Sequence, residues 1–180
     1  PDEFEMLRRN PRRLESLTVE PGKDLRLEDI KGDCMELAIE AVIPRDGVLG
    51  LKVRATPDGE EQTAIIVDTS AHSLCVDTSQ STLRPDILQP FPIMRTDERD
   101  DVRVQAAPLA LGPDEPLQLR VFIDRSILEV YANGRQCVTQ RIYPTRADSL
   151  GVALFSQRGA TSVLSLDAWD VTPTNTQTME

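Results

Sequence analysis

Two acidic residues that lie close together, Asp124 and Glu129, are the first candidates for chemistry in this sequence. Hydrolysis of a glycosidic bond needs only two carboxyl groups, which in a retaining enzyme lie about 5–5.5 Å apart. On an unbroken strand their odd separation would place them on opposite faces, although a bulge at Arg125-Ser126 would restore a common face. A sheet surface offers no deep, water-excluding pocket, so the sequence favours Asp124 or Ser126 as a partner for backbone donors at a turn.

The single histidine, His72, lies beside two serines, Ser70 and Ser73. A catalytic Ser/His pair needs an acid that orients the histidine, and none is identifiable, so we interpret His72 as a surface turn residue. The sequence contains no Gly-X-Ser-X-Gly elbow, no Gly-rich phosphate loop and no His-Glu-X-X-His motif. A zinc site would have to combine His72 with carboxylates alone, and we expect no metal and no other cofactor.

The three cysteines, Cys34, Cys75 and Cys137, lie far apart in the sequence. Cysteine pairs that bind zinc are usually separated by about two to four residues, and these are not. An odd number cannot form a closed set of internal disulfides. We predict that the cysteines are small buried hydrophobic residues, with one bridge between two of them as the main alternative.

Sugar binding without catalysis requires an exposed aromatic platform, and the chain has only one Trp, two Tyr and four Phe. Trp169 follows Leu164, Leu166 and Ala168 on the opposite parity of an alternating stretch, which could turn its ring outward. Trp169 is therefore the one candidate carbohydrate-binding residue. The competing interpretation is packing in a core or an interface, where large aromatic residues on strands are more often found.

Composition limits the class of protein that can carry these residues. A chain of 180 residues with 39% hydrophobic and 28% charged residues fits one folded domain that needs no disulfide or metal to fold. Thirty acidic residues against twenty basic ones give a net charge of −10, which argues against nucleic acid or an anionic membrane as the main partner. The acidic start, which begins with Pro1, has no secretory signal and suggests a trimmed chain or a piece of a longer one. The sequence indicates no compartment.

Alternation of apolar and polar residues at period two recurs throughout and predicts strands rather than helices. In residues 36–43 both glutamates share one face, which predicts a strand with one solvent-exposed side. Strands are predicted at residues 36–43, 48–55, 63–69, 73–78, 117–124, 126–132, 135–143, 150–156 and 162–171. Asn133-Gly134 supplies the two positive φ angles of a tight hairpin and should pair the strands on either side of it. The predicted fold is an all-β, two-sheet antiparallel sandwich of the jelly-roll or concanavalin-like kind, with about nine to twelve strands.

Three segments are predicted along the chain: a linker at residues 1–13, the sandwich at residues 14–171 and a polar tail at residues 172–180. The linker could hold a short helical turn at Glu3 to Arg9. Within the sandwich, Arg84 to Pro116 carries six prolines and the charge cluster Asp97–Asp101. We expect a long loop there, with one strand near Val102 to Gln105.

Several motifs together resemble a known family. These motifs are Leu119–Gly134, Arg141–Pro144, Gly50–Arg54, Pro57–Thr63 and Val76-Asp77. Their order and spacing are similar to those of the C-terminal β-sandwich in family 32 glycoside hydrolases, which include invertases, inulinases, levanases and fructan exohydrolases. The resemblance covers roughly Leu14 to Val171, which is nearly the whole chain.

The resemblance implies that catalysis belongs to another domain. Family members carry their catalytic residues on an N-terminal five-bladed propeller, in Asn-Asp-Pro, Arg-Asp-Pro and Glu-Cys segments, and none of these occurs here. Asp33 precedes Cys34, and Asp124 is followed by Arg125, so no catalytic residue carries over. The implied function is a non-catalytic module of a β-fructosidase-like hydrolase that packs on the propeller through an apolar patch and stabilises it or mediates oligomerisation. A homodimer and a carbohydrate ligand are further candidate partners, and a free-standing carbohydrate-binding or protein-interaction module is the alternative. A self-sufficient enzyme is a third class.

Overall fold

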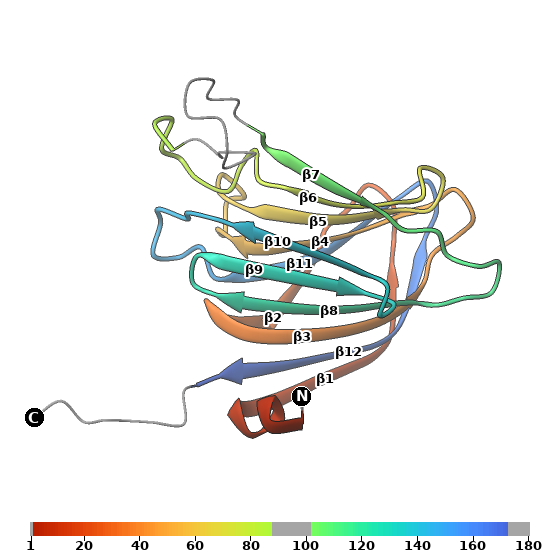
Figure 1. The fold of residues 1–180 in the computed structure, drawn as a ribbon, viewed down its shortest axis with the longest axis horizontal. Helices are drawn as coiled ribbons and strands as arrows, with labels where there is room; N and C mark the ends of the chain where they lie inside the picture. The colour runs from red at the N-terminus through yellow and green to blue at the C-terminus, as the bar shows by residue number, and fades with distance from the viewer. Residues whose placement is uncertain (1, 88–101, 173–180) are drawn as a thin grey trace, which may run out of the picture.

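Twelve strands and one short 3-10 helix form the part of the chain that the computed structural model describes, residues 2–87 and 102–172 (Figure 1). The elements are η1 (Asp2–Leu7), β1 (Arg8–Val19), β2 (Leu25–Lys31), β3 (Cys34–Val42), β4 (Val48–Ala55), β5 (Thr63–Asp68), β6 (Ser73–Asp77), β7 (Val104–Pro108), β8 (Leu117–Asp124), β9 (Ile127–Ala132), β10 (Gln136–Arg141), β11 (Gly151–Gln157) and β12 (Thr161–Val171). Among these residues, none of the helical structure reaches the length and hydrophobicity of a membrane span. The charge cluster Asp97–Asp101 and tail residues 173–180 lie outside the described residues.

The strands form two antiparallel six-stranded sheets, which confirms the predicted β-sandwich. Sheet A has the strand order β1-β12-β3-β8-β9-β10, and sheet B has the order β2-β11-β4-β5-β6-β7. In Figure 1 the strands of sheet A run down the front of the molecule from β10 to β1, with the N-terminus beside β1 and β12. Strands distant in sequence are neighbours in sheet A: β12 lies between β1 and β3, so the first and last strands pair directly.

Side chains on the inner faces of the two sheets form one hydrophobic core. The period-two alternation of β3 and β8 directs every second residue inward, so that Leu37 and Val121 are register partners and both are fully buried. Leu51 of β4 and Leu154 of β11 contribute the facing layer from sheet B. Since this burial follows directly from the alternation, the core was the part of the fold most accessible to sequence reasoning.

Every strand predicted from the alternation is present, with bounds that differ by a few residues, and the strand expected near Val102 to Gln105 is β7. Strands β1 and β2 were not predicted. Strand β1 contains Pro11 and a bulge between Arg9 and Arg12, and its alternation is further broken by positive φ angles at Asn10 and Ser16. It begins inside the segment 1–13 expected to be a linker, directly after η1, which lies where the short helical turn was predicted.

The Asn133-Gly134 hairpin between β9 and β10 is confirmed, with φ angles of 48° and 60°. The Asn133 side chain also accepts a hydrogen bond from the Gln118 backbone N–H (3.0 Å) and donates one to Glu115 (2.9 Å). The turn is therefore fixed both by its backbone conformation and by contacts to the start of β8.

The prediction that the three cysteines are buried was wrong. All three are free thiols, and Cys137 is exposed while Cys34 and Cys75 are half-buried. Each occupies an outward-facing position of its strand, for example Cys137, whose register partner is the exposed Tyr131. The alternation of the surrounding strands, rather than the hydrophobicity of the thiol, decides where these side chains point.

Candidate functional site

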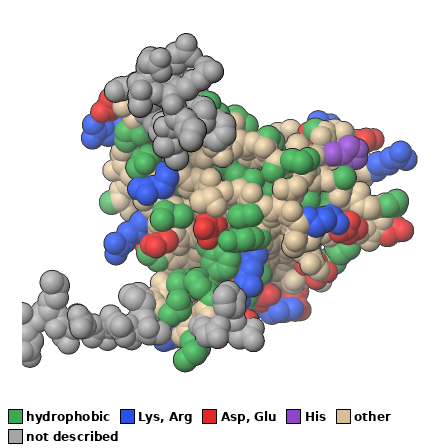
Figure 2. All heavy atoms as spheres, in the orientation of Figure 1, with side chains coloured by type: hydrophobic (Ala, Val, Ile, Leu, Met, Phe, Trp, Pro, Cys, Tyr) green, Lys and Arg blue, Asp and Glu red, His purple; other side chains and the backbone are tan. Residues whose placement is uncertain are grey.

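A groove of about 1210 Å³ crosses the outer face of sheet A. Residues of η1, β3, β8, β9 and β12 line it, and two of them, Ile127 and Tyr131, are large hydrophobic side chains with 37% and 40% of their surface exposed. Hydrophobic, acidic and basic side chains are interspersed over the face seen in Figure 2. An open groove of this kind suits a macromolecular surface better than a small substrate, because small ligands are usually enclosed on most sides.

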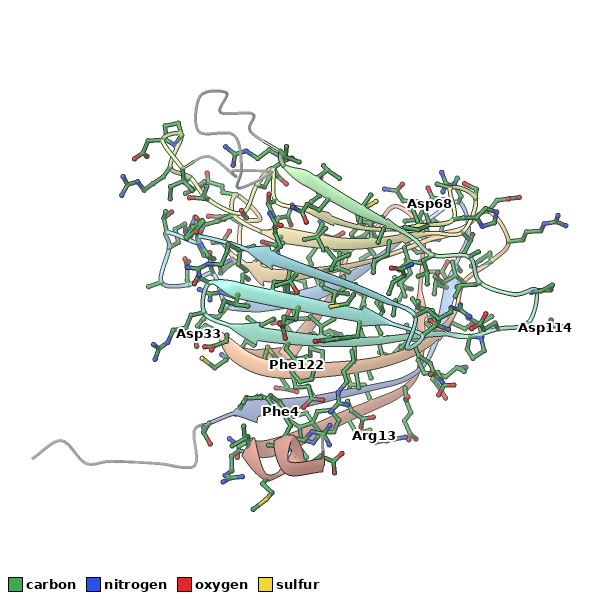
Figure 3. The ribbon with its side chains drawn as sticks, viewed as in Figure 1. Phe4, Arg13, Asp33, Asp68, Asp114 and Phe122 are labelled. Carbon is green, nitrogen blue, oxygen red and sulfur yellow. The ribbon has the colours of Figure 1, made fainter. Side chains whose placement is uncertain are left out.

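Three aromatic rings join the N-terminal segment to this groove. Phe4 of η1 contacts Phe122 of β8 edge-to-face with a centroid distance of 4.9 Å, and Phe122 contacts Tyr131 of β9 in the same way at 6.0 Å. Phe4 and Phe122 lie next to one another in Figure 3. Such edge-to-face pairs add to the stability gained from the area they bury, so these contacts hold η1 against the groove.

The strand that contains Glu36 was expected to have one solvent-exposed side. That expectation was wrong for Glu36, which lies on the outer face of sheet A and is nevertheless fully buried. Arg8 donates two hydrogen bonds to its carboxylate, each 2.8 Å long, and Arg120 donates a third of 2.6 Å. Burial alone would raise the pKa of Glu36, but the two guanidinium groups outweigh burial and hold the pKa below its ordinary value. Glu36 is therefore an ionised carboxylate that ties β1 and β8 to β3.

Trp169 faces outward, as its parity suggested, and is the register partner of Glu36. The Arg8 guanidinium lies over its ring at 4.2 Å from the centroid, so one face of the indole is already occupied by a cation–π contact. The ring is half-buried and is not among the residues that line the groove. Sugar stacking at Trp169 stays a prediction.

The two carboxylates considered for catalysis share the outer face, because the chain reverses at Arg125-Ser126 instead of running straight. Asp124 pairs with Ile127, and Glu129 pairs with Phe122, which makes the two acids diagonal neighbours on adjacent strands. Asp124 is exposed and accepts a weak 3.6 Å contact from the Cys34 thiol. Since a catalytic acid normally depends on burial to keep its proton, this open position does not favour hydrolysis.

His72 lies exposed in the turn between β5 and β6, which confirms its interpretation as a surface turn residue. Its carbonyl oxygen accepts a hydrogen bond from the Leu109 N–H (2.7 Å). The neighbouring Ser70 hydroxyl donates to Asp68 (2.8 Å), so Ser70 and His72 form no catalytic pair. Within residues 2–87 and 102–172, no group of three or more His, Cys, Asp or Glu is arranged to bind a metal.

A buried arginine, Arg54, fixes one end of the groove. It is 8% exposed, and it donates from Nε to the Ser149 carbonyl (2.6 Å) and from Nη1 to the Arg125 carbonyl (2.8 Å). Burial lowers the pKa of this guanidinium. The Arg125 N–H in turn donates to the Asp33 carbonyl (2.6 Å). One side chain of sheet B thus holds the β8–β9 turn of sheet A in place.

Glu61 holds three loops together at the same end of the sandwich. Its fully buried carboxylate accepts hydrogen bonds from the backbone N–H groups of Leu83 (3.2 Å), Thr145 (2.7 Å) and Arg146 (3.0 Å). It also accepts from the hydroxyl groups of Thr145 (2.7 Å) and Ser149. Burial would raise its pKa, but these donors outweigh burial and lower it. Because Ser149 also binds Arg54, the Glu61 and Arg54 contacts form one continuous network.

Sequence reasoning missed the residues that organise this face, Glu36, Arg8 and Arg120, and those that hold the adjoining end of the sandwich, Arg54 and Glu61. One signal was present: four arginines fall within residues 8–13 of an otherwise acidic chain. Two of them pair with β12, Arg12 with Asp170 and Arg13 with Asp167. A cluster of basic residues inside an acidic protein therefore indicated internal ion pairing rather than an exposed tail.

The family described as "Glycosyl hydrolases family 32 C terminal" matches residues 3–170 of the chain. The levanase of Bacillus subtilis is 32% identical over 184 aligned residues, which cover 95% of this chain and 24% of the levanase. An insoluble β-fructofuranosidase isoenzyme of Arabidopsis thaliana is 30% identical, with 69% of this chain and 21% of the relative covered. The chain thus spans about a quarter or less of the length of these relatives.

Solved structures show the same fold. The chain is similar to fructan 1-exohydrolase IIa from Cichorium intybus with a TM-score of 0.77 at 23% identity, over 95% of this chain and 37% of that one. Exo-inulinase from Aspergillus awamori gives a TM-score of 0.71 at 19% identity, over 96% of this chain and 31% of that one. In both, a larger part of the polypeptide lies outside the matched sandwich.

Proposed function

Because the chain belongs to the family of glycosyl hydrolase family 32 C-terminal domains, we propose that it is the non-catalytic C-terminal module of a β-fructosidase-like hydrolase. The parent enzyme would hydrolyse terminal fructosyl bonds of sucrose or fructans. Its catalytic groups would lie on an N-terminal propeller, because no carboxylate of this chain matches the family's catalytic motifs.

The observation that carries the proposal is the groove on the outer face of sheet A. It exposes Ile127 and Tyr131 on either side of Glu129, the register partner of Phe122, and the helix η1, which leads into the domain, packs on Phe122 through Phe4. A domain that precedes η1 would therefore meet this face first. Covering the groove would stabilise the assembly by about 25 cal/mol for each Å² of apolar surface removed from water.

The first test is the coding sequence upstream of Pro1. We expect it to encode about 300 or more residues of strand-rich repeats, as a propeller requires. The 180-residue chain alone should release no fructose from sucrose, inulin or levan. Upstream sequence without such repeats, or turnover by the chain alone, contradicts the proposal.

The second test concerns docking. The chain should bind the upstream polypeptide, and Ile127→Asp should weaken that binding because it places a charge in the apolar interface. Val104→Asp is a matched control, because Val104 is 49% exposed on β7 of the other sheet. Equal loss of binding in both variants would locate the interface elsewhere.

Carbohydrate binding at Trp169 is the alternative for the same domain, favoured by the outward position of the ring. The contact from Arg8 leaves one indole face for a sugar. Calorimetry of the chain with sucrose, inulin and levan tests it: heat that disappears in Trp169→Ala but persists in Phe155→Ala supports a sugar site at Trp169. Phe155 is a comparably half-buried ring on the outer side of sheet B.

Self-association through the uncovered groove is the remaining partner proposal. If two copies cover each other's apolar residues, gel filtration should show a dimer that Tyr131→Asp converts to a monomer. A wild-type chain that elutes as a monomer at every concentration would exclude the homodimer.

A further inference from the structure

Arg125 stands at the tip of the β8–β9 hairpin and at the edge of the groove that it lines. Its side chain is exposed. Its backbone has a φ of 52°, in the left-handed region that residues other than Gly, Asn and Asp rarely occupy. No hydrogen bond or ion pair of its guanidinium is present within residues 2–87 and 102–172.

The side chains of the other two arginines with positive φ make hydrogen bonds or ion pairs within the domain. Arg54 (φ 49°) binds two carbonyl groups in the interior, and Arg158 (φ 58°) donates to the Asp46 carbonyl and pairs with Asp68. The next hairpin of the same sheet uses Asn133-Gly134 at its turn, the pair that tolerates positive φ most easily. Arg125 thus occupies a strained position, and within the described residues its guanidinium makes no hydrogen bond or ion pair that would explain an arginine there, which points to an external role.

The backbone around Arg125 is held rigidly. Its carbonyl accepts from the buried Arg54 guanidinium and its N–H donates to the Asp33 carbonyl, so both backbone groups are fixed by other parts of the domain. The guanidinium therefore projects from a fixed base beside the exposed Ile127. Preorganisation of this kind reduces the loss of conformational entropy when a partner binds.

We infer that Arg125 is a docking residue that pairs with a carboxylate on the N-terminal domain seated in the groove, an inference that rests on the proposed function. The guanidinium presents parallel N–H donors that fit a carboxylate in a two-bond arrangement. A polyanion such as nucleic acid would need several unpaired cations here, whereas Arg120, the other arginine that lines the groove, is paired with Glu36, and Asp33 and Asp124 flank Arg125. The apolar side chains next to Arg125 supply the contact area, and Arg125 fixes the orientation of the two domains.

The test is calorimetric titration of the 180-residue chain into the polypeptide encoded upstream of it. We expect Arg125→Glu to weaken binding about tenfold or more, and Arg125→Lys to weaken it less, because lysine keeps the charge but loses the fork. The matched control is Arg45→Glu. Arg45 is also an exposed arginine without a contact in the described part of the chain, but it lies in the turn at the opposite end of β3. Binding by this control should stay within about twofold of wild type.

Arg125→Gly is a second variant for the case that Arg125→Glu fails to fold. Glycine adopts a φ of 52° without strain, so this variant should keep the folded structure. This variant should keep or raise the thermal midpoint of the domain. It should nevertheless weaken binding to the upstream polypeptide, because the charge that pairs with the carboxylate is lost. Wild-type affinity in Arg125→Glu or Arg125→Gly would overturn the role of Arg125 and leave docking intact. Absence of binding by the wild-type chain would overturn the proposed function and this inference together.

Discussion

The Glu36 carboxylate and the Arg8 guanidinium meet in a two-bond fork, with both N–O distances at 2.8 Å, on the outer side of sheet A. Arg8 is the first residue of β1 and follows η1 directly. The fork therefore fixes the place where the chain enters the sandwich, beside the groove that we propose to be a docking surface. Arg8 also stacks on Trp169, so the same guanidinium joins β1, β3 and β12.

Glu36→Gln should destabilise the domain by about 3 kcal/mol, at the low end of the range for a broken buried ion pair, because Arg8 and Arg120 can reach solvent. Urea unfolding followed by circular dichroism measures the change. Glu40→Gln, on the same strand and half-buried, should change stability by less than about 0.5 kcal/mol. If the two substitutions lowered stability equally, the fork between Arg8 and Glu36 would not contribute more to stability than an ordinary half-buried glutamate.

Stability should fall as the pH drops below 4.5. The pKa values of Glu36 and Glu61 are both held below the ordinary value of 4.5, so the unfolded chain takes up protons first. The contribution of the two carboxylates to the free energy of unfolding is then fully present above pH 4.5. As the pH falls from 4.5 towards the folded pKa, each contribution decreases by about 1.4 kcal/mol per pH unit. Unfolding curves measured between pH 6 and pH 3 test this, and Glu36→Gln should show a shallower decrease than wild type.

Glu61→Ala should loosen three loops at once, because five donors lose their acceptor. Unsatisfied buried donors cost about 1–3 kcal/mol each, and relaxation of the loops towards water offsets part of that, so we expect a net loss of about 3 kcal/mol. Hydrogen exchange at Thr145 and Arg146 should accelerate more than exchange in β3. Unchanged protection of these two amides would show that the loops are held by other contacts.

Arg125→Gly should stabilise the isolated domain by about 1 kcal/mol, since it removes the left-handed strain at a position whose guanidinium makes no hydrogen bond or ion pair with the residues that the structure describes. Arg158→Gly is the instructive comparison. It relieves a similar φ of 58° but loses the 2.7 Å pair with Asp68 and the 2.7 Å hydrogen bond to the Asp46 carbonyl. The thermal midpoint of Arg125→Gly should therefore be higher than that of Arg158→Gly. The reverse order would show that the Arg125 side chain stabilises the isolated domain.

The sequence was sufficient to predict the sandwich because its strands bury every second residue, as Leu37 and Val121 do. It was also sufficient for the β9–β10 hairpin, since the conformation of Asn133-Gly134 is a local property. Strand β1 escaped prediction because its place in the sheet depends on ion pairs with β12 and β3, which only the fold brings near.

The organisation of the groove escaped prediction for the same reason. Arg54 and Arg125 are 71 residues apart, and the hydrogen bond between them depends on the packing of two sheets. The burial of Glu36 likewise depends on Arg8 and Arg120, which come from 28 residues before it and 84 residues after it. Alternation reports which face a side chain occupies, but it does not report what covers that face.

Strand β1 is twelve residues long and lies at the edge of sheet A, where no other strand of the described residues pairs with its outer side. A flat edge of that length would offer a template for fibril growth. Pro11 removes one amide donor, and the bulge between Arg9 and Arg12 breaks the register. The interrupted edge thus disfavours pairing of β1 with the same edge of a second chain.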